Sequence, residues 1–152
     1  MPNSSKLRTF LWFNNTLEEA LNFYTSTFGD NVVIHSSGRP EADGKLMTAA
    51  FSIFGHEIIG MGWPGGPEFT DAISLSISCD GQAETDRLWE AITKDGKAGQ
   101  CGWCKDPFGV SWQITPSQMQ DYLEQNDSEK RDYAWSALRT MGKIVLKDFI
   151  KP

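Results

Sequence analysis

The stretch of sequence that decides the fold is residues 9–24, which read TFLWFNNTLEEALNFY. Residues 74–89, which lie 65 positions further along, read SLSISCDGQAETDRLW and have the same layout. Each stretch predicts a short strand, a polar turn and then a helix that carries glutamate and ends in an aromatic residue. Self-similarity at about half the chain length indicates two fused copies of one supersecondary unit. Two such copies usually form a shared cleft.

The first copy is expected to contain one strand, one helix and then three strands. The helix is predicted at Leu17–Phe28, with Glu18 and Glu19 in its first turn, where the helix dipole favours carboxylates. The strands around it are predicted at Leu7–Phe13, Val32–Ile34, Leu46–Phe54 and Glu57–Trp63, with a tight turn at Gly55 and His56.

The second copy repeats this order with a shortened set of strands. Its helix is predicted at Ala83–Lys94, and its strands at Ala72–Cys79, Gln100–Lys105 and Val110–Thr115. Asp106–Gly109 has the residue order of a type I turn. Helices that precede antiparallel strands indicate an α+β fold, with the helices on one face of a curved sheet.

One domain is the default for a chain of 152 residues. Within it we expect module one at 7–63, a linker at 64–71, module two at 72–115 and a helical tail at 116–152. We also expect a homodimer, because a two-module sheet leaves long edges and flat surfaces that invite a two-fold partner. The tail then either crosses to the partner or braces the dimer; the alternative is that it covers only its own sheet. The apolar residues of this tail are Ala134, Ala137, Leu138, Met141, Ile144, Val145, Leu146, Phe149 and Ile150.

Charge and composition exclude several classes of partner. The net charge of −6 argues against nucleic acid or an anionic membrane, since both bind basic surfaces. No apolar stretch approaches the length of a membrane span, and no signal-peptide core follows the N-terminus. Three cysteines in apolar contexts indicate reduced thiols. These features predict a cytoplasmic protein.

Strand alternation indicates which residues could line a ligand pocket. Ile73, Leu75 and Ile77 alternate with serines, so the apolar row should meet the helices and the serine row should face away from them. The 65-residue offset assigns the equivalent row of the first strand, and two glycines of the fourth strand allow close approach of a ligand or another chain. These rows could equally be plain solvated faces. The predicted pocket residues are Thr9, Leu11, Phe13, Gly60, Ser74, Ser76, Ser111 and Gln113.

Several short motifs resemble those of the PhnB-like proteins, which also carry the domain label 3-demethylubiquinone-9 3-methyltransferase. The resemblance covers about residues 7–150, and its most specific part runs from Gly99 to Gln113. The motifs are Leu11-Trp12-Phe13, Glu18-Glu19-Ala20, Asn22-Phe23-Tyr24, Gly99-Gln100-Cys101-Gly102-Trp103, Lys105-Asp106, Phe108-Gly109 and Ser111-Trp112-Gln113.

This family is similar to the vicinal-oxygen-chelate superfamily, which includes glyoxalase I, bleomycin-resistance proteins and extradiol dioxygenases. The resemblance implies paired βαβββ modules, a cup-shaped mixed sheet and commonly a homodimer. Metal enzymes of the superfamily carry His or Glu at four strand positions, and the matching residues here look like Thr9, Gly60, Ser74 and Gln113. None of these is a good metal ligand, so neither a metal nor another cofactor is expected.

Three functions are consistent with these observations. The first is binding of an unidentified small molecule in the cup without a metal, and it favours a binding protein over an enzyme. The second is a lyase, isomerase or dioxygenase with an unusual site, and the third is an interaction protein. Methyl transfer, as in the domain label, lacks the glycine-rich turn of a nucleotide-type cofactor fold.

The remaining candidate groups are cysteines and histidines. Cys101 and Cys104 have Cys-x-x-Cys spacing, but we expect them in a strand, where residues three apart point to opposite faces and pair poorly. Two packed, reduced thiols are therefore expected. His35 and His56 are the only histidines and are interpreted as surface residues.

Overall fold

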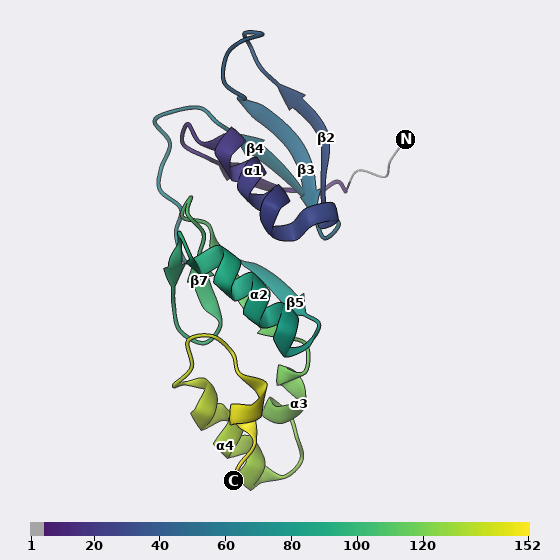
Figure 1. Ribbon diagram of the computed structural model, residues 1–152, viewed down its shortest axis with the longest axis vertical. Helices are drawn as coiled ribbons and strands as arrows, with labels where there is room; N and C mark the ends of the chain where they lie inside the picture. Colours follow the sequence, from purple (N-terminus) through teal and green to yellow (C-terminus); the bar gives the residue numbers. More distant parts are fainter. Residues whose placement is uncertain (1–4) are drawn as a thin grey trace. The chain divides into compact units, whose positions relative to one another are not determined.

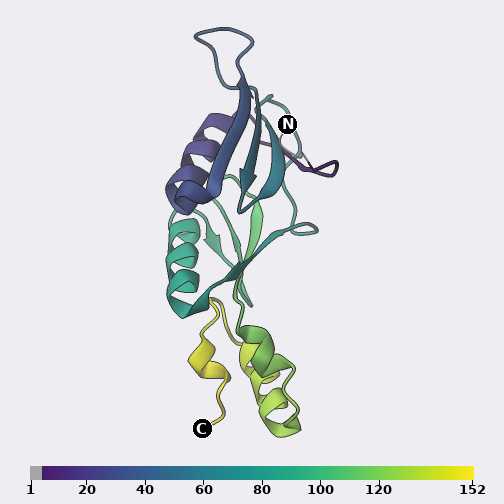
Figure 2. The ribbon, with the colours of Figure 1, turned by 90° about the vertical axis from the view of Figure 1, so that its right-hand side faces the viewer.

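The computed structural model describes residues 5–152, and the chain divides into two compact units. The first ends at Glu68 and the second begins at Phe69. Each unit contains one βαβββ module (Figures 1 and 2), and the second also holds the C-terminal helices. The predicted α+β class with two such modules and a helical tail is confirmed. Within residues 5–152, no helix is long and apolar enough to span a membrane.

The first unit is a mixed four-stranded sheet in the order β1-β4-β3-β2, with α1 packed on one face (Figure 2). β1 and β4 are parallel, while the other two pairs are antiparallel. Its elements are β1 (Thr9–Trp12), α1 (Leu17–Phe28), the 3-10 turn η1 (Gly29–Asn31), β2 (Val32–Gly38), β3 (Thr48–Ile53) and β4 (His56–Met61).

The core of the first unit lies between α1 and the sheet. Tyr24 is fully buried, with its ring 6.1 Å from that of Phe13 and 6.5 Å from that of Phe51. The predicted bounds of this helix are confirmed. The hairpin between β3 and β4 turns at Phe54 and Gly55, both of which have positive φ, so the expected turn at Gly55 and His56 is wrong by one residue.

The second unit repeats this arrangement with the order β5-β8-β7-β6, and β5 is parallel to β8. The expectation of a shortened set of strands is wrong, because β6 completes the module as a two-residue strand. The elements are β5 (Leu75–Cys79), α2 (Gly81–Thr93), β6 (Lys97–Ala98), β7 (Trp103–Lys105), β8 (Ser111–Pro116), α3 (Met119–Leu123), α4 (Ser128–Leu138) and the 3-10 turn η2 (Leu146–Phe149).

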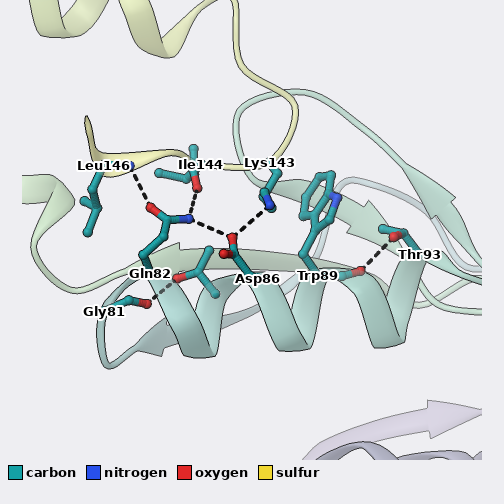
Figure 3. Close-up of polar contacts among 9 residues, drawn as sticks. Gly81, Gln82, Asp86, Trp89, Thr93, Lys143, Ile144 and Leu146 are labelled. Atoms are coloured by element: carbon teal, nitrogen blue, oxygen red, sulfur yellow. Dashed lines mark hydrogen bonds and ion pairs between the residues drawn. The ribbon is translucent and has the colours of Figure 1, made fainter. Parts of the chain in front are cut away.

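The C-terminal segment folds onto the second module of its own chain. The side chain of Gln82 on α2 donates to the carbonyl of Ile144 at 2.9 Å and accepts from the backbone N–H of Leu146 at 2.8 Å (Figure 3). One turn along the helix, Asp86 pairs with Lys143 at 2.8 Å. Two neighbouring groups of α2 therefore hold residues 143–146 in place, and the predicted homodimer stays a prediction.

The helical tail has a small core of its own. The core is formed by Leu123, Ala134, Met141, Ile144 and Phe149, with Met119, Tyr122, Ala137, Leu138 and Leu146 packed against it. The ring of Tyr122 stacks on that of Phe149 at 5.5 Å. The apolar face predicted for this part of the chain is thus buried or partly buried within the second unit, except at Ile150, which is 58% exposed.

Candidate functional site

The candidate site lies on the far face of the second sheet, meaning the face opposite α2. In β8, Trp112 and Ile114 are buried on the side of α2, so Gln113 must point to the far face. Strand pairing places Ser76 of β5 and Trp103 of β7 on either side of Gln113. In the same way Lys105 lies opposite Ser111, so the far face carries polar groups and one large aromatic ring.

A cavity of about 560 Å³ opens where this face meets β6 and the turn that follows it. Its walls combine charged, apolar and thiol groups from residues 97–101 and 103–105 with a single carboxylate from the segment before β5. The lining residues are Asp71, Lys97, Ala98, Gly99, Gln100, Cys101, Trp103, Cys104 and Lys105. Ligand pockets of proteins usually measure a few hundred to about 1,000 Å³, so this cavity has room for a small organic molecule.

Asp71 organises the polar side of the cavity. Its carboxylate accepts a hydrogen bond from the hydroxyl of Ser111 at 2.7 Å and pairs with the ammonium of Lys105 at 3.2 Å. The Ser111 hydrogen bond, followed by the hydrogen bond and charge of Lys105 and the charge of Lys97, lowers the pKa of Asp71. The carboxyl group is therefore ionised at neutral pH.

The residues predicted for the pocket in the second module lie together on the far face. The side-chain amide of Gln113 donates to the hydroxyl of Ser74 at 3.0 Å, and Ser76 is its neighbour across the β5–β8 pair. Ser111 is buried and joins this row to the cavity through Asp71. The strand register expected for this half of the chain agrees with the structure, whereas binding of a ligand to it stays a prediction.

In the first module, the predicted pocket residues lie on the face of the sheet that α1 covers, so the prediction of their face is wrong. Phe13 packs against Tyr24 of α1, and Leu11 is buried beside Gly60 in the β1–β4 pair. A Cβ on Gly60 would lie 2.5 Å from the Cδ1 of Leu17, so this glycine permits close approach of α1 rather than of a ligand. Thr9 also lies on the helix side and is within 2.8 Å of the Nε2 atom of His56.

The error has a simple cause in the repeat offset. α1 begins at Leu17 and α2 at Gly81, which are 64 positions apart rather than 65. A shift of one residue in a strand moves every side chain to the opposite face. Phe10 and Trp12, rather than Leu11 and Phe13, therefore correspond to the serine row, and Phe10 is 57% exposed.

The sequence analysis did not predict Asp71, Lys97, Trp103 or Lys105 as site residues. They supply the charged groups and the aromatic ring of the cavity. The alternation of Trp103 and Lys105 in β7 was visible in the sequence. Its face became clear only when the pairing with Gln113 and Ser111 was known.

On each sheet, the face that the helix leaves uncovered lacks the side chains of a metal site of the kind that the superfamily resemblance implies. On β4, Glu57 is a carboxylate, and the Nε2 atom of His35 lies 3.1 Å from it. In the β1–β4 and β5–β8 pairs, the other uncovered positions include those of Phe10, Trp12, Ile59, Met61, Ser76 and Gln113, none of which is a carboxylate, an imidazole or a thiol. Among residues 5–152, no three His, Cys, Asp or Glu side chains come together to hold a metal.

The two cysteines of the Cys-x-x-Cys motif lie in different surroundings. Cys101 sits in the turn before β7 with a φ of 57°, and its thiol donates to the carbonyl of Leu138 at 3.3 Å. Cys104 is buried in β7, where burial, followed by the negative charge of Asp106, raises the pKa of its thiol to about 12. The expectation that both lie in one strand is wrong for Cys101, but all three cysteines are free, as expected.

This difference predicts which thiol reacts in the native protein. Cys101 is partly exposed and lines the cavity, so we expect it to react first with a disulfide reagent. Burial raises the pKa of Cys79 as well as that of Cys104, so neither carries a reactive thiolate near neutral pH. Stopped-flow labelling should show a single fast thiol that is lost in Cys101→Ser; a fast phase that survives this change would contradict the prediction.

Comparison with known proteins identifies the family. Residues 5–115 match the family model described as 3-demethylubiquinone-9 3-methyltransferase. The chain belongs to this family. The match includes both modules, except for the last residue of β8, and every residue of the cavity. No curated protein matches the chain.

Two solved structures are similar to this chain over most of its length. The chain is 32% identical to a PhnB protein from Bacillus cereus, which covers 74% of this chain and 99% of its own, with a TM-score of 0.67. Protein PA1353 from Pseudomonas aeruginosa is 25% identical, with a TM-score of 0.57, covering 72% of this chain and 95% of its own.

A solved structure with lower sequence identity shares the fold. The fosfomycin resistance protein FosX from Listeria monocytogenes, solved with Mn(II) and sulfate, has a TM-score of 0.52. It is 16% identical and covers 80% of this chain and 98% of its own. This likeness shows a common fold for the methyltransferase-named family and FosX. The family match over residues 5–115 and the 32% identity to the PhnB protein confirm the family resemblance read from the sequence.

Proposed function

We propose that this chain binds a small organic molecule in the cavity beside β6 and β7, without a divalent metal. The cavity on the far face of the second sheet carries the proposal, because it combines an aromatic wall with a few convergent polar groups. Trp103 supplies the largest apolar surface there, and the indole ring is a common platform for flat ligands.

The polar groups around the ring support binding more than catalysis. The carboxylate of Asp71 is engaged by Ser111 and Lys105, and Cys104 holds a protonated thiol. A general base must be free to accept a proton near neutral pH, and neither group meets that requirement. Gln113 and Ser74 share a hydrogen bond with each other and lie outside the lining of this cavity.

Equilibrium dialysis against a panel of small aromatic compounds tests the proposal. We expect saturable binding of at least one member, and we expect Trp103→Ala to weaken it by about tenfold, as loss of a stacked ring commonly does. The matched control is Trp135→Ala on α4, whose indole is 43% exposed and does not line the cavity. Absence of saturable binding, or equal effects of the two substitutions, would contradict the proposal.

A further inference from the structure

We infer that the cavity selects molecules with one anionic group on a flat apolar body, the anion binding at Lys97 and Lys105 and the body lying against Trp103. This inference rests on the proposed function and names the chemical class of its ligand. The three side chains project from two paired strands, since Lys97 of β6 lies opposite Lys105 of β7. Trp103 lies two residues before Lys105, on the same face of β7.

The charges around the cavity leave one positive charge uncompensated. Asp71 pairs with Lys105 at 3.2 Å, whereas Lys97 makes no ion pair within the described part of the chain. Both ammonium groups are close enough to act on the carboxylate of Asp71 through their charges. The cavity is therefore locally positive, although the whole chain has a net charge of −6. A positive potential favours binding of an anion over a cation.

Asp71 also fixes the position of one of the two cations. Lys105 is held by the carboxylate, which is itself anchored by the hydroxyl of Ser111. An ammonium group has three N–H donors, so Lys105 can keep this contact and still donate to a ligand oxygen. A ligand anion therefore meets one positioned lysine and one free lysine, and a single anionic group suffices to balance the charge.

The apolar part of the ligand is defined by the surroundings of Trp103. Beside the ring, the cavity is lined by Ala98 and Gly99, neither of which has a polar side chain. A small charged ion without an apolar body would leave this surface in contact with water. Burial of a ring against it contributes free energy in proportion to the apolar area removed from water.

Benzoate and benzamide test the inference because they have the same size and shape and differ in charge. With the full-length protein, we expect benzoate to bind about tenfold more tightly than benzamide, since hydrogen bonds between charged groups are stronger than neutral ones. Lys97→Gln should lower the affinity for benzoate to that for benzamide and leave benzamide unaffected. The matched control is Lys94→Gln, an exposed lysine at the end of α2 that does not line the cavity.

The outcomes separate this inference from the proposed function. If both compounds bind equally and Lys97→Gln changes neither affinity, the anion selectivity is overturned while binding of a small molecule stands. If acetate binds as tightly as benzoate, the role of the apolar wall is overturned. If no aromatic compound binds at all, both proposals fail. Native spectra of each variant, compared with the unmodified chain, confirm that the fold is intact.

Discussion

Replacement of Asp106 with alanine is expected to lower the free energy of unfolding by about 3–5 kcal/mol, because it removes a carboxylate that accepts hydrogen bonds from two buried donors and one partly buried donor. The Asp106 side chain is buried and follows β7 directly. Its Oδ1 accepts from the backbone N–H groups of Phe108 at 2.9 Å and Val110 at 3.1 Å. Its Oδ2 accepts from the indole N–H of Trp112 at 2.9 Å.

These contacts explain why one residue should matter so much. The turn from Asp106 to Gly109, closed by a backbone hydrogen bond of 3.1 Å, connects β7 to β8, which carry Trp103 and Gln113 on the far face. Chemical denaturation measures the effect. Asp106→Asn is the graded comparison, because its amide retains one acceptor oxygen and should lose less. Asp95→Ala, at an exposed position, should stay within about 0.5 kcal/mol of the unmodified chain. A loss from Asp106→Ala no larger than that of Asp95→Ala would contradict this account of the turn.

The second large effect is expected at Gly60, where α1 comes closest to the sheet. Valine at this position would place its Cβ 2.5 Å from the Cδ1 of Leu17 and 3.3 Å from the Cε1 of Phe51. Both neighbours are almost fully buried and have little room to move. Overpacking of this kind costs about 1–3 kcal/mol, so Gly60→Val should destabilise the first unit by an amount in this range.

A double-mutant cycle tests the reason for that loss. Leu17→Ala alone should cost about 2–5 kcal/mol, since it opens a cavity under α1. In the double variant the valine side chain can occupy the space that Leu17 leaves, so the combined loss should be smaller than the sum. Additive losses would show that Gly60 does not set the approach of the helix. Ile59→Val, on the opposite face of β4, is the matched control.

The sequence was sufficient to predict those elements that depend on residues close together in the chain. The bounds of α1 follow from its apolar period and its two flanking polar turns, and the turn at Asp106–Gly109 follows from its residue types. The missed strand β6 has only two residues, Lys97 and Ala98, and exists because Lys105 and Cys104 pair with it. A strand this short has no periodicity of its own.

The candidate site depended on information that a single sequence does not contain. The alternation of Leu11 and Phe13 was visible, but assigning its face needed the true offset between the two copies, which strand and helix starts reveal only in three dimensions. Prediction of the cavity would also have required the contacts between residues that are far apart in the sequence. Asp71 lies far from Lys105 and Ser111 in the sequence, and their contacts follow from the register of β7 and β8.

The measurement that tests the central claim most directly is a two-dimensional ¹⁵N–¹H NMR titration of the full-length chain with benzoate. The account predicts saturable shift changes that are largest at the backbone amides of residues 97–105 and of Ser111, and that are lost in Trp103→Ala. No saturable change, or changes confined to the first unit or to the second pocket, which is lined by α4 and residues 140–152, would contradict a ligand site in the cavity beside β6 and β7.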